Sequence, residues 1–585
     1  MIPGDPSSTV AETCRVIRAT VARQLCTGIY PFVDTIGCLP PIRRFDRIEG
    51  TTRGAESCER PPRTPNHQVP AARRCGWTDD HRRDGPRDRE SGSRLGSGSI
   101  ERIATRSRRI VRERASGGAT GTGVTGVRRS EALLATSREA PDAGTDATAL
   151  LRRAGLIRDF GSGLYGFLPT GERVLRKVRA RIEAAMDAVG AQRVGLPALQ
   201  YSGDWRASGR WESFEDEMFT LENRDGQAMC LAPSHEEGAV RLLDGVVRSH
   251  DDLPLVVYQV GEKYRDDHAR NGLVRCKAFE MKDAYSVHAS EDSLAATYRE
   301  LRAAYLRVFD DVGLDVAVVP VDDDVMGGAA SEEFVAPVAD GSDRLVRCTA
   351  ADCRFGRTAE AAGFGAVAAG DACPDCGDRL AASEGIEVGH VFQLGRRYTE
   401  ALGLTVDDAE GGESHPTMGS YGIGITRVVQ TLVQQRAVDA AGAADGAGES
   451  AGGDRLDCRW PVTDWGSVAP YRAAIVPLDY EGRHGAVADE LYRACGHEDV
   501  LLYDDPDQSI GERFAESALL GVPAKVVVGN HYDETGEVEL ERADGTTESV
   551  SPAAVPDVVA AFAAGGGATG DGRTDDGRTG EDRGY

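Results

Sequence analysis

The chain has 585 residues, 41% of them hydrophobic, and a formal net charge of −26. A chain of this length is expected to form about two to four domains. It contains no stretch of about 18 apolar residues, so no transmembrane helix is expected, and the start of the chain lacks the pattern of a secretory signal peptide.

The charge is divided unevenly along the chain. Residues 1–126 contain 22 Arg, no Lys and 14 acidic residues, a net charge of +8, whereas the rest contains 46 basic and 80 acidic residues, a net charge of −34. Excess carboxylate with little lysine favours a protein from a high-salt cytoplasm, where salt of about 1 M screens charges within about 3 Å and a high net charge maintains solubility. An acidic protein at ordinary salt is the alternative.

Residues 1–126 do not have the pattern of a folded domain. Arg, Gly, Ser and Pro dominate this segment, and its apolar residues have no clear period. One interpretation is a disordered basic arm that binds nucleic acid. The other is that the segment is not part of the natural protein and that translation starts near Val127.

Two amphipathic helices are predicted in the next part of the chain, over 170–190 and 290–313. In the first, Thr170 is expected to cap the helix and Gly190 to end it. Strands are expected after both helices and between them, at 192–199, 226–232, 253–264, 274–287 and 315–320. This number of strands is enough for an antiparallel sheet flanked by helices.

A second, smaller domain is predicted near the C-terminus. The segment 437–468 begins with a run rich in Ala, Gly and Asp and is predicted to be a linker. Residues 469–563 alternate strands with helices, which favours an α/β domain with a parallel core. A hairpin is expected at Asp544-Gly545. The tail 564–585 repeats Asp-Gly-Arg-Thr and is expected to be disordered.

Arg265 and Arg275 bracket a polar loop between two apolar stretches. Arginine binds a polyphosphate through its planar, permanently charged fork, and a purine stacks on an aromatic or guanidinium plane. An acid can accept a hydrogen bond from the purine amino group, so Asp267 and Phe279 complete a possible nucleotide site. An ordinary surface hairpin that carries arginines is the alternative.

A glycine-rich stretch, 415–435, is predicted to be a strand that enters a helix. Gly419, Gly422 and Gly424 lie in the strand, where the absence of a side chain lets a ligand approach the backbone. Arg427 lies about one turn into the helix, from which its guanidinium can reach a phosphate.

These segments together resemble the three motifs of class II aminoacyl-tRNA synthetases. The helix at 170–190 with Pro197 resembles the first motif, "RDD" with "RCKAF" the second, and "GSYGIGITR" the third. The stretches "SGLYGFLPTGERVL", "SGRW", "LAPSHEE", "FEMKDAYSVH" and "IEVGHVFQLG" are similar to bacterial-type prolyl-tRNA synthetases. "VRRSEALL" resembles the usual start of that family, which favours a natural start at Val127. The resemblance covers about 127 to 563.

The resemblance implies an α+β catalytic domain over 127–436 and an anticodon-binding domain over 469–563. It implies that ATP is a substrate, with Mg²⁺, and that Arg265 holds the α-phosphate and the amino-acid carboxylate. Arg275 and Arg427 are expected to hold the β- and γ-phosphates. The remaining expected ATP contacts are Asp267, Phe279 and Gln393. Asp267 stands where the family usually has glutamate, and its side chain is one methylene shorter.

The resemblance also implies a proline pocket. Ser234, where the family usually has threonine, and Glu236 are expected to receive the imino group. The other expected pocket residues are Arg265, Met281, Asp283, Tyr285 and His390. Core packing is the alternative for Met281 and Tyr285. Glu387 is a weaker candidate for binding Mg²⁺. Arg265 and Arg427 are the expected catalytic groups.

Four of the thirteen cysteines have metal-ligand spacing. Cys348 and Cys353 form a C-x4-C pair, and Cys373 and Cys376 form a C-x2-C pair. This pattern is typical of a structural zinc ribbon with four thiolates, at about 340–384. Four free thiols in a reducing cytoplasm are the alternative.

Many bacterial-type relatives carry an inserted domain in this position that removes alanine wrongly joined to tRNA. The segment between Phe334 and Ile386 is too short for such a domain. The sequence thus predicts a cytoplasmic, homodimeric short form, acting on proline and tRNA(Pro), that lacks this editing activity. A threonine, serine or glycine enzyme of the same class, or a non-catalytic tRNA-binding relative, is the alternative. Pro506 replaces an arginine that is common in the family, which leaves the anticodon contact open.

Overall fold

The computed structural model describes residues 127–137, 147–214, 216–321, 326, 330–359, 364–444, 457–496 and 499–563, with only the backbone for 437–444. All of them lie in one of the two units into which the chain divides, Leu95–Tyr585. The predicted N-terminal extension and C-terminal tail lie outside the described residues. None of the helices in these described ranges is both long and apolar enough to cross a bilayer.

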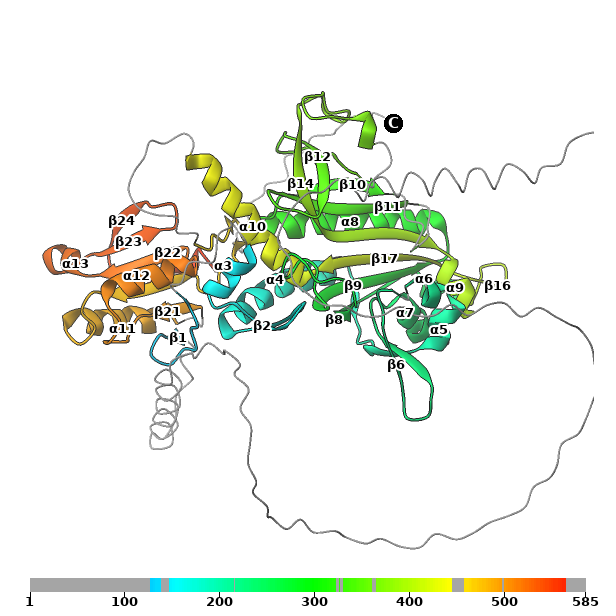
Figure 1. Cartoon of the computed structure of the whole chain (residues 1–585), viewed down its shortest axis with the longest axis horizontal. Helices are drawn as coiled ribbons and strands as arrows, with labels where there is room; N and C mark the ends of the chain where they lie inside the picture. Colours follow the sequence, from blue (N-terminus) through cyan, green and yellow to red (C-terminus); the bar gives the residue numbers. More distant parts are fainter. Residues whose placement is uncertain are drawn as a thin grey trace, which may run out of the picture. The chain divides into compact units, whose positions relative to one another are not determined.

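The larger domain is built on the antiparallel sheet that the sequence predicted. Its strands run in the order β10-β11-β14-β17-β9-β8-β4, and β4 pairs with β8 in parallel. Figure 1 shows β17, β9 and β8 side by side. The bounds are β4 Gln192–Arg193, β8 Leu255–Tyr264, β9 Ala278–His288, β10 Ala317–Val321, β11 Ala330–Val338, β14 Leu380–Gly395 and β17 Thr417–Gly424. Two further strands, β12 Asp343–Cys348 and β13 Gly356–Thr358, extend the sheet beside β14.

Three long helices pack together on one face of this sheet: α4 Pro169–Ala188, α8 Glu291–Val312 and α10 Ile425–Ala444. Successive residues of a strand point to opposite faces, and Ala284 packs with these helices while Tyr285 packs on the other side. The apolar stripe predicted for α4 is buried, with Val174, Val178 and Ile182 at most 1% exposed.

The helix ends agree only in part with the sequence prediction. Ser290 caps α8 by accepting a hydrogen bond from the Ser293 amide, and Gly313 ends that helix. The predicted cap of α4 was wrong, because the helix begins at Pro169 and the Thr170 side chain is buried inside its first turn. Proline is favoured at this position because the first amides of a helix have no internal partner.

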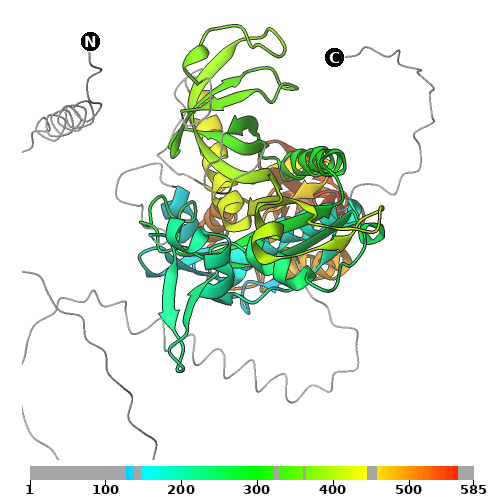
Figure 2. The ribbon, with the colours of Figure 1, turned by 90° about the vertical axis from the view of Figure 1, so that its right-hand side faces the viewer.

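Shorter elements cover the opposite face and edges of the sheet. Helices α5 Ser202–Ala207, α7 Glu236–Leu243 and α9 Arg397–Leu402 contact one another there, and α6 Arg210–Ser213 packs on α5. Figure 2 shows two extensions that project from the domain, the β12–β14 segment and the β6–β7 hairpin. The remaining elements of this domain are α3 Ala147–Arg153, β2 Ile157–Gly161, β3 Leu164–Phe167, β5 Leu199–Tyr201, β6 Phe219–Glu222, β7 Ala228–Leu231, η2 His250–Asp252, η3 Phe364–Ala366, β15 Val406–Asp407 and β16 Glu413–Ser414.

The C-terminal domain has the predicted parallel core. Its sheet order is β1-β21-β20-β22-β23-β24, in which the first four strands are parallel and the last two antiparallel. The strands are β20 Ala473–Pro477, β21 Val500–Leu502, β22 Ala524–Val528, β23 Val538–Arg542 and β24 Thr547–Val550. The helices are α11 Arg483–Cys495, α12 Ile510–Leu519, α13 Asn530–Thr535 and α14 Val555–Ala560.

The edge strand β1 of this sheet is Val127–Arg128, which the sequence analysis placed in the catalytic domain. Arg128 forms ion pairs with Asp489 and Asp504, and Arg129 with Glu516 at 2.6 Å. Opposite charges far apart in the sequence therefore join the first described residues to the C-terminal domain.

The predicted linker also contains regular structure at both ends. Helix α10 continues to Ala444, and two short paired strands, β18 Val462–Thr463 and β19 Gly466–Ser467, follow before the C-terminal sheet. Alanine has the highest helix propensity, which explains why an Ala-rich stretch extends the helix rather than beginning the linker.

Candidate active site

The sheet of the larger domain forms the floor of a cavity of about 330 Å³. Strand β9 contributes every second residue from Phe279 to Tyr285, since alternate side chains of a strand share one face. Nine residues that the sequence analysis placed in the ATP and proline sites line this one cavity: Ser234, Glu236, Arg265, Phe279, Met281, Asp283, Tyr285, His390 and Arg427. The sequence analysis therefore selected groups that the fold brings together.

One end of the cavity is rich in arginine. The Arg265 guanidinium lies 5.4 Å from the centre of the Phe279 ring, and burial together with the nearby Arg427 lowers the pKa of Arg265. Arg427 donates to the Val274 carbonyl at 3.0 Å and pairs with Glu387 at 2.9 Å. Two neighbouring guanidinium groups repel each other, so an anion between them is stabilised at this end.

Glu387 holds the arginine end in place. Burial raises the pKa of its carboxyl, but hydrogen bonding to His390 and the charge of Arg427 outweigh this effect and lower it. The His390 ring also stacks on Phe392, with ring centres 3.8 Å apart. Glu387 is therefore ionised and fixed between a guanidinium and an imidazole.

The other end of the cavity contains buried carboxylates. Glu236 pairs with Arg210 at 3.0 Å and accepts a hydrogen bond from Ser420 at 3.0 Å. Burial raises the pKa of the Glu236 carboxyl, but Arg210 and Ser234 lower it below its ordinary value. Glu236 is thus an ionised carboxylate at the cavity wall, a suitable partner for a cationic amine.

Asp283 and Tyr285 form the floor between these groups. Asp283 pairs with Lys263 at 2.6 Å and accepts hydrogen bonds from the Tyr285 hydroxyl at 2.8 Å and from Gln259 at 2.9 Å. The backbone amide of His235 donates to the same tyrosine hydroxyl. Because the charge of Asp283 is balanced inside the protein, its role in the cavity is to fix shape and polarity.

Three of the predicted ATP contacts lie outside this cavity. Arg275 pairs with Asp267 at 2.6 Å and faces a neighbouring hollow that Arg152 and Arg270 also line. Burial raises the pKa of the Asp267 carboxyl, but Arg275 outweighs this and lowers it. Gln393 lies on β14 opposite Gly419 of β17.

Sequence reasoning missed several lining residues, notably Arg210, Lys263 and Glu333. Arg210 belongs to "SGRW", which was used only for the resemblance. Lys263 lies on β8, two residues before Arg265, which directly follows that strand, so strand alternation could have placed both on the cavity face.

The predicted clustering of the four cysteines is confirmed. The Cys348 and Cys376 sulfurs are 3.4 Å apart, those of Cys353 and Cys373 are 3.7 Å apart, and all four lie within 4.8 Å of one another. A tetrahedral zinc with bonds of about 2.3 Å would hold its sulfurs about 3.8 Å apart. The cluster lies between β12, β13 and β14, and its donor set fits zinc.

A second group that could hold a cation lies in the main cavity. Ligand atoms of Glu333, Glu387 and His390 also lie within 4.8 Å of one another. The two carboxylates are hard oxygen donors of the kind that magnesium prefers, whereas the imidazole is a donor more typical of transition metals. The earlier candidate Glu387 is thus accompanied by a second carboxylate from β11.

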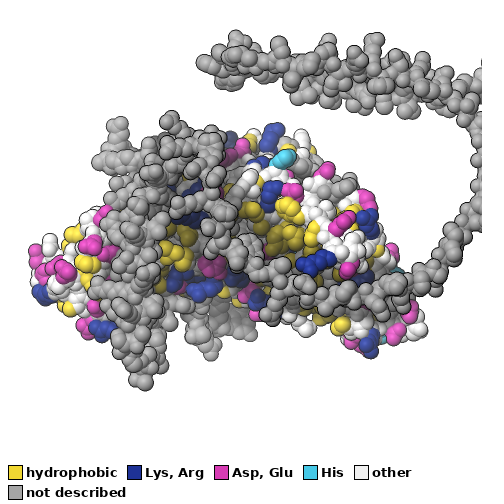
Figure 3. Space-filling view, turned by 60° about the horizontal axis from the view of Figure 1, so that its bottom comes forward, with side chains coloured by type: hydrophobic (Ala, Val, Ile, Leu, Met, Phe, Trp, Pro, Cys, Tyr) yellow, Lys and Arg dark blue, Asp and Glu magenta, His cyan; other side chains and the backbone are white. Residues whose placement is uncertain are grey.

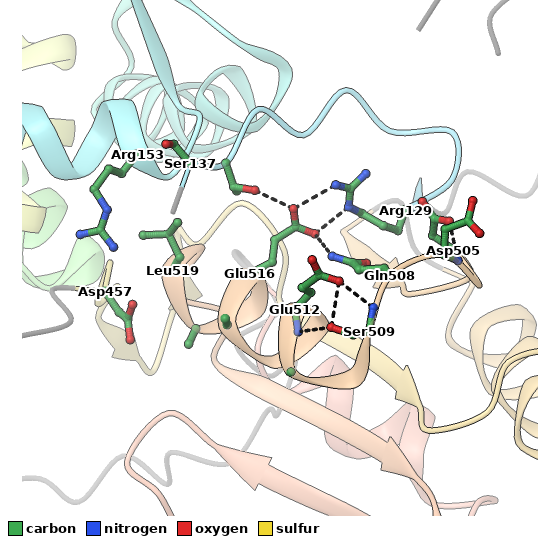
Figure 4. Close-up of a pocket in the computed structure, with 15 residues that line it drawn as sticks. Arg129, Ser137, Arg153, Asp457, Asp505, Gln508, Ser509, Glu512, Glu516 and Leu519 are labelled. Carbon is green, nitrogen blue, oxygen red and sulfur yellow. Dashed lines mark hydrogen bonds and ion pairs between the residues drawn. The ribbon is translucent and has the colours of Figure 1, made fainter. Parts of the chain in front are cut away.

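A larger hollow of about 760 Å³ lies beside α12 of the C-terminal domain. Figure 4 shows two of its carboxylates engaged by neighbouring side chains: Glu516 accepts from Arg129 at 2.6 Å and from Gln508 at 3.2 Å, and Glu512 accepts from Ser509. The bond between Arg129 and Glu516 fastens the segment after β1 to α12. We therefore assign no reaction to this hollow.

The family comparisons agree with the two domains. Residues 219–436 match the tRNA synthetase class II core domain (G, H, P, S and T), and residues 472–561 match an anticodon binding domain. The antiparallel sheet, the arginine-lined cavity and these matches define a class II aminoacyl-tRNA synthetase.

The relatives narrow this class further. The chain is 34% identical over 445 residues to the proline–tRNA ligase of Gluconobacter oxydans (strain 621H), covering 72% of this chain and 96% of the relative. It is also 34% identical over 460 residues to that of Rhizorhabdus wittichii, covering 75% and 100%. The chain belongs to the prolyl-tRNA synthetase family.

Solved structures have the same fold. Prolyl-tRNA synthetase from Cryptosporidium parvum, complexed with halofuginone and AMPPNP, matches with a TM-score of 0.54 at 13% identity, covering 71% of this chain and 75% of that chain. The Giardia lamblia enzyme in complex with prolyl-adenylate gives 0.53 at 17% identity, covering 70% and 73%.

Proposed function

We propose that this chain activates L-proline with ATP and transfers the proline to tRNA(Pro). The observation that supports this most directly is the position of Arg265 in the cavity. Its guanidinium lies in the cavity that Arg427 lines at the arginine end and Glu236 at the carboxylate end. A group in this position can hold the proline carboxylate and the α-phosphate of ATP together.

The proposed roles follow from the two ends of the cavity. Glu236 and Ser234 bind the proline imino group, while Met281, Asp283, Tyr285 and His390 surround its ring. Arg265, Phe279 and Arg427 bind ATP, with adenine stacked on Phe279. Asp267, Arg275 and Gln393 stay proposed ATP contacts, and the Arg275 guanidinium has to leave Asp267 to reach a phosphate.

The first step joins proline to the nucleotide. A carboxylate oxygen of proline attacks the α-phosphorus, the bond to the bridging oxygen breaks, and pyrophosphate leaves. The arginines act by holding the two reactants in line and by neutralising the charge that develops. Mg²⁺ bound with ATP would neutralise phosphate charge, and Glu387 with Glu333 would hold it.

The second step transfers proline to tRNA. A 3′-terminal ribose hydroxyl of the tRNA attacks the carbonyl carbon of the adenylate, and AMP leaves with its phosphate. No covalent intermediate with the protein is needed. The C-terminal domain, which matches an anticodon binding domain, is proposed to select tRNA(Pro).

Exchange of pyrophosphate into ATP tests the first step. We expect exchange that depends on proline and on magnesium. Threonine, serine and glycine should give no comparable signal. Exchange driven by one of these amino acids and not by proline would contradict the proposal.

We also propose that the four cysteines bind structural zinc. Four thiolates fill a tetrahedral site and leave no open position for a reaction. The metal content of the purified protein, measured by atomic emission, should be about one zinc per chain, and Cys373→Ser should reduce it. Retention of full zinc after this substitution would contradict the assignment.

We further propose, from the length of the same segment, that this enzyme does not remove alanine wrongly joined to tRNA(Pro). Alanine is smaller than proline and enters the same pocket, and a missing methylene is worth only about 1–3 kcal/mol. The chain between Phe334 and Ile386 is used by β12, β13 and the four-cysteine cluster. Incubation with alanyl-tRNA(Pro) should therefore give no deacylation above the rate without enzyme.

The composition of the chain and its cysteines bear on the compartment in which the enzyme works. We propose a cytoplasmic homodimer adapted to high salt. The strong excess of carboxylates over basic residues after residue 126 supports the adaptation to high salt. The eight described cysteines, which form no disulfide, fit a reducing compartment. Figure 3 shows acidic side chains spread over the visible face rather than gathered in one patch. Light scattering in molar KCl should give the mass of two chains.

A further inference from the structure

A buried arginine, Arg210, lies behind the proposed imino-binding end of the cavity. It begins helix α6 and its side chain has no exposed surface. Its guanidinium pairs with Glu236 at 3.0 Å and Glu237 at 3.1 Å, and it donates to the Ser234 hydroxyl oxygen at 2.8 Å. Arg210 thus touches both groups proposed to receive the imino group.

Aromatic rings fix the plane of this guanidinium. Its central carbon lies 4.7 Å from the ring centre of Trp205, 4.6 Å from that of Phe214 and 5.6 Å from that of Tyr398. Such contacts stabilise a cation, and more strongly where water is excluded. The rings come from α5, from the residue after α6 and from α9, so the fold surrounds Arg210 before any substrate binds.

The charges around Arg210 do not balance. Glu236 and Glu237 are 3% and 1% exposed, and both face the same guanidinium. Glu237 also accepts a hydrogen bond from Ser208 at 2.6 Å, on the side away from the cavity. Two carboxylates against one cation leave the cluster short of one positive charge when both are ionised. Lys263 does not supply it, because Lys263 is paired with Asp283.

We propose that Arg210 is a positioning residue for the amino-acid substrate: it holds Glu236 as a carboxylate and orients the Ser234 hydroxyl, so that the pocket is completed by a cationic secondary amine. This inference rests on the proposed function. It explains how a carboxylate stays ionised in a site where burial alone would favour the neutral acid.

The consequence is a pH dependence that appears when Arg210 is lost. Without the guanidinium, burial and the Glu237 charge raise the pKa of Glu236, so Glu236 becomes neutral as the pH falls. Proline binding then weakens at low pH and recovers as the pH rises. The charged or titratable groups that face Glu236 are Arg210, Glu237, His235, Lys263, Arg265, Asp283, Tyr285 and Tyr398.

The test uses Arg210→Met, Arg210→Lys and a matched control. Arg302→Met removes an ion-paired arginine of α8 that lies outside the cavity. KM for proline and for ATP is measured by pyrophosphate exchange between pH 6 and pH 8.5. Arg210→Met should raise KM for proline by about 100-fold, the loss expected for a charged hydrogen bond at a buried site, and change KM for ATP by less than about threefold. The control should change neither.

Arg210→Lys and one double variant separate electrostatics from folding. Arg210→Lys keeps the charge but not the fork, and should raise KM for proline by about tenfold. Adding Glu237→Gln to Arg210→Met removes the like charge beside Glu236, and should recover about tenfold of the lost proline affinity and reduce the pH dependence. Circular dichroism checks that each variant folds, and Arg210→Lys decides the question if Arg210→Met does not.

The outcomes are distinct. If the unaltered protein gives no proline-dependent exchange, the proposed function fails. If it does, an unchanged KM for proline in the folded arginine variants overturns the role of Arg210. An equal rise in KM for proline and ATP, without a pH dependence, also overturns it, since that pattern indicates a general structural role.

Discussion

The two ends of the catalytic cavity are built differently. At the carboxylate end, Glu236 and Arg210 are buried and paired with each other, and Glu236 also accepts a hydrogen bond from Ser420. At the arginine end, Arg265 and Arg427 are partly exposed, and the Arg265 guanidinium lies over the Phe279 ring and donates to the Pro233 carbonyl at 3.4 Å. The proposed imino-binding end is therefore a buried, pre-formed cluster, whereas the proposed phosphate-binding end is partly open to solvent, with Arg427 paired to Glu387.

Loss of the group shared by both ends should have the largest effect. Arg265→Ala removes contacts to the proline carboxylate and to the α-phosphate, each worth about 1.5–3 kcal/mol. We expect kcat/KM for proline-dependent pyrophosphate exchange to fall by at least about 1,000-fold. Arg299→Ala, a change of an exposed arginine on α8, should leave exchange intact. A similar loss in both variants would show that the effect is not specific to the cavity.

A change at the carboxylate end should affect KM for proline and KM for ATP differently. Glu236→Gln removes the carboxylate that meets the imino group but keeps the size of the side chain. KM for proline should rise by about 100-fold, while KM for ATP changes by less than about threefold. A larger effect on ATP than on proline would mean that the two ends have been assigned the wrong way round.

Two buried histidines, His235 and His288, should make the stability of the protein sensitive to acid. Burial lowers the pKa of His235 and of His288 to about 4, whereas an unfolded histidine titrates near 6.5. The unfolded state then binds more protons between these values, so stability falls as the pH drops from about 6.5 to 4, by roughly 3 kcal/mol for each histidine.

Urea unfolding at pH 7 and pH 5 measures this loss. His288→Gln removes one of the two groups and keeps a side chain able to bond Ser286 and Ser293, which His288 contacts at 2.8 and 2.9 Å. The variant should lose less stability between the two pH values than the unaltered protein. An equal loss in both would contradict the assignment to His288.

The smallest effect is expected for the ion pair between Asp267 and Arg275, which lies outside the cavity. Asp267→Ala releases Arg275 from its ion pair without touching the cavity wall. An exposed ion pair is worth about 1 kcal/mol or less, so KM for ATP should change by less than about fivefold, in either direction. A loss as large as that of Arg265→Ala would place Asp267 at the adenine after all.

Much of the site followed from local sequence patterns. Strand alternation placed Met281, Asp283 and Tyr285 on one face, and the glycine-rich strand with its helix placed Arg427 beside them. The cysteine spacing likewise predicted the thiol cluster. Each of these predictions depends on residues close together in the chain or on a motif of fixed geometry, which explains why each was recoverable.

The missed features share a different cause. The ion pairs of Arg128 and Arg129 with the C-terminal domain join residues more than 350 positions apart. The ion pairs of Arg210 with Glu236 and of Lys263 with Asp283 also join different elements, although these residues are closer in the sequence. No local pattern reports which charges will face each other once strands and helices from different segments are packed.

The sequence by itself determined the order of the elements, the two domains and the residue types proposed to bind phosphate, amine and metal. Periodicity and motif spacing are local properties, and they can be recognised in the sequence without knowledge of the packing. The tertiary structure alone decided that Glu236 is ionised, that Arg275 pairs with Asp267 and that the strand at Val127 completes the C-terminal sheet. Burial and charge compensation decide these points, because the energy of a charge depends on everything that surrounds it in space.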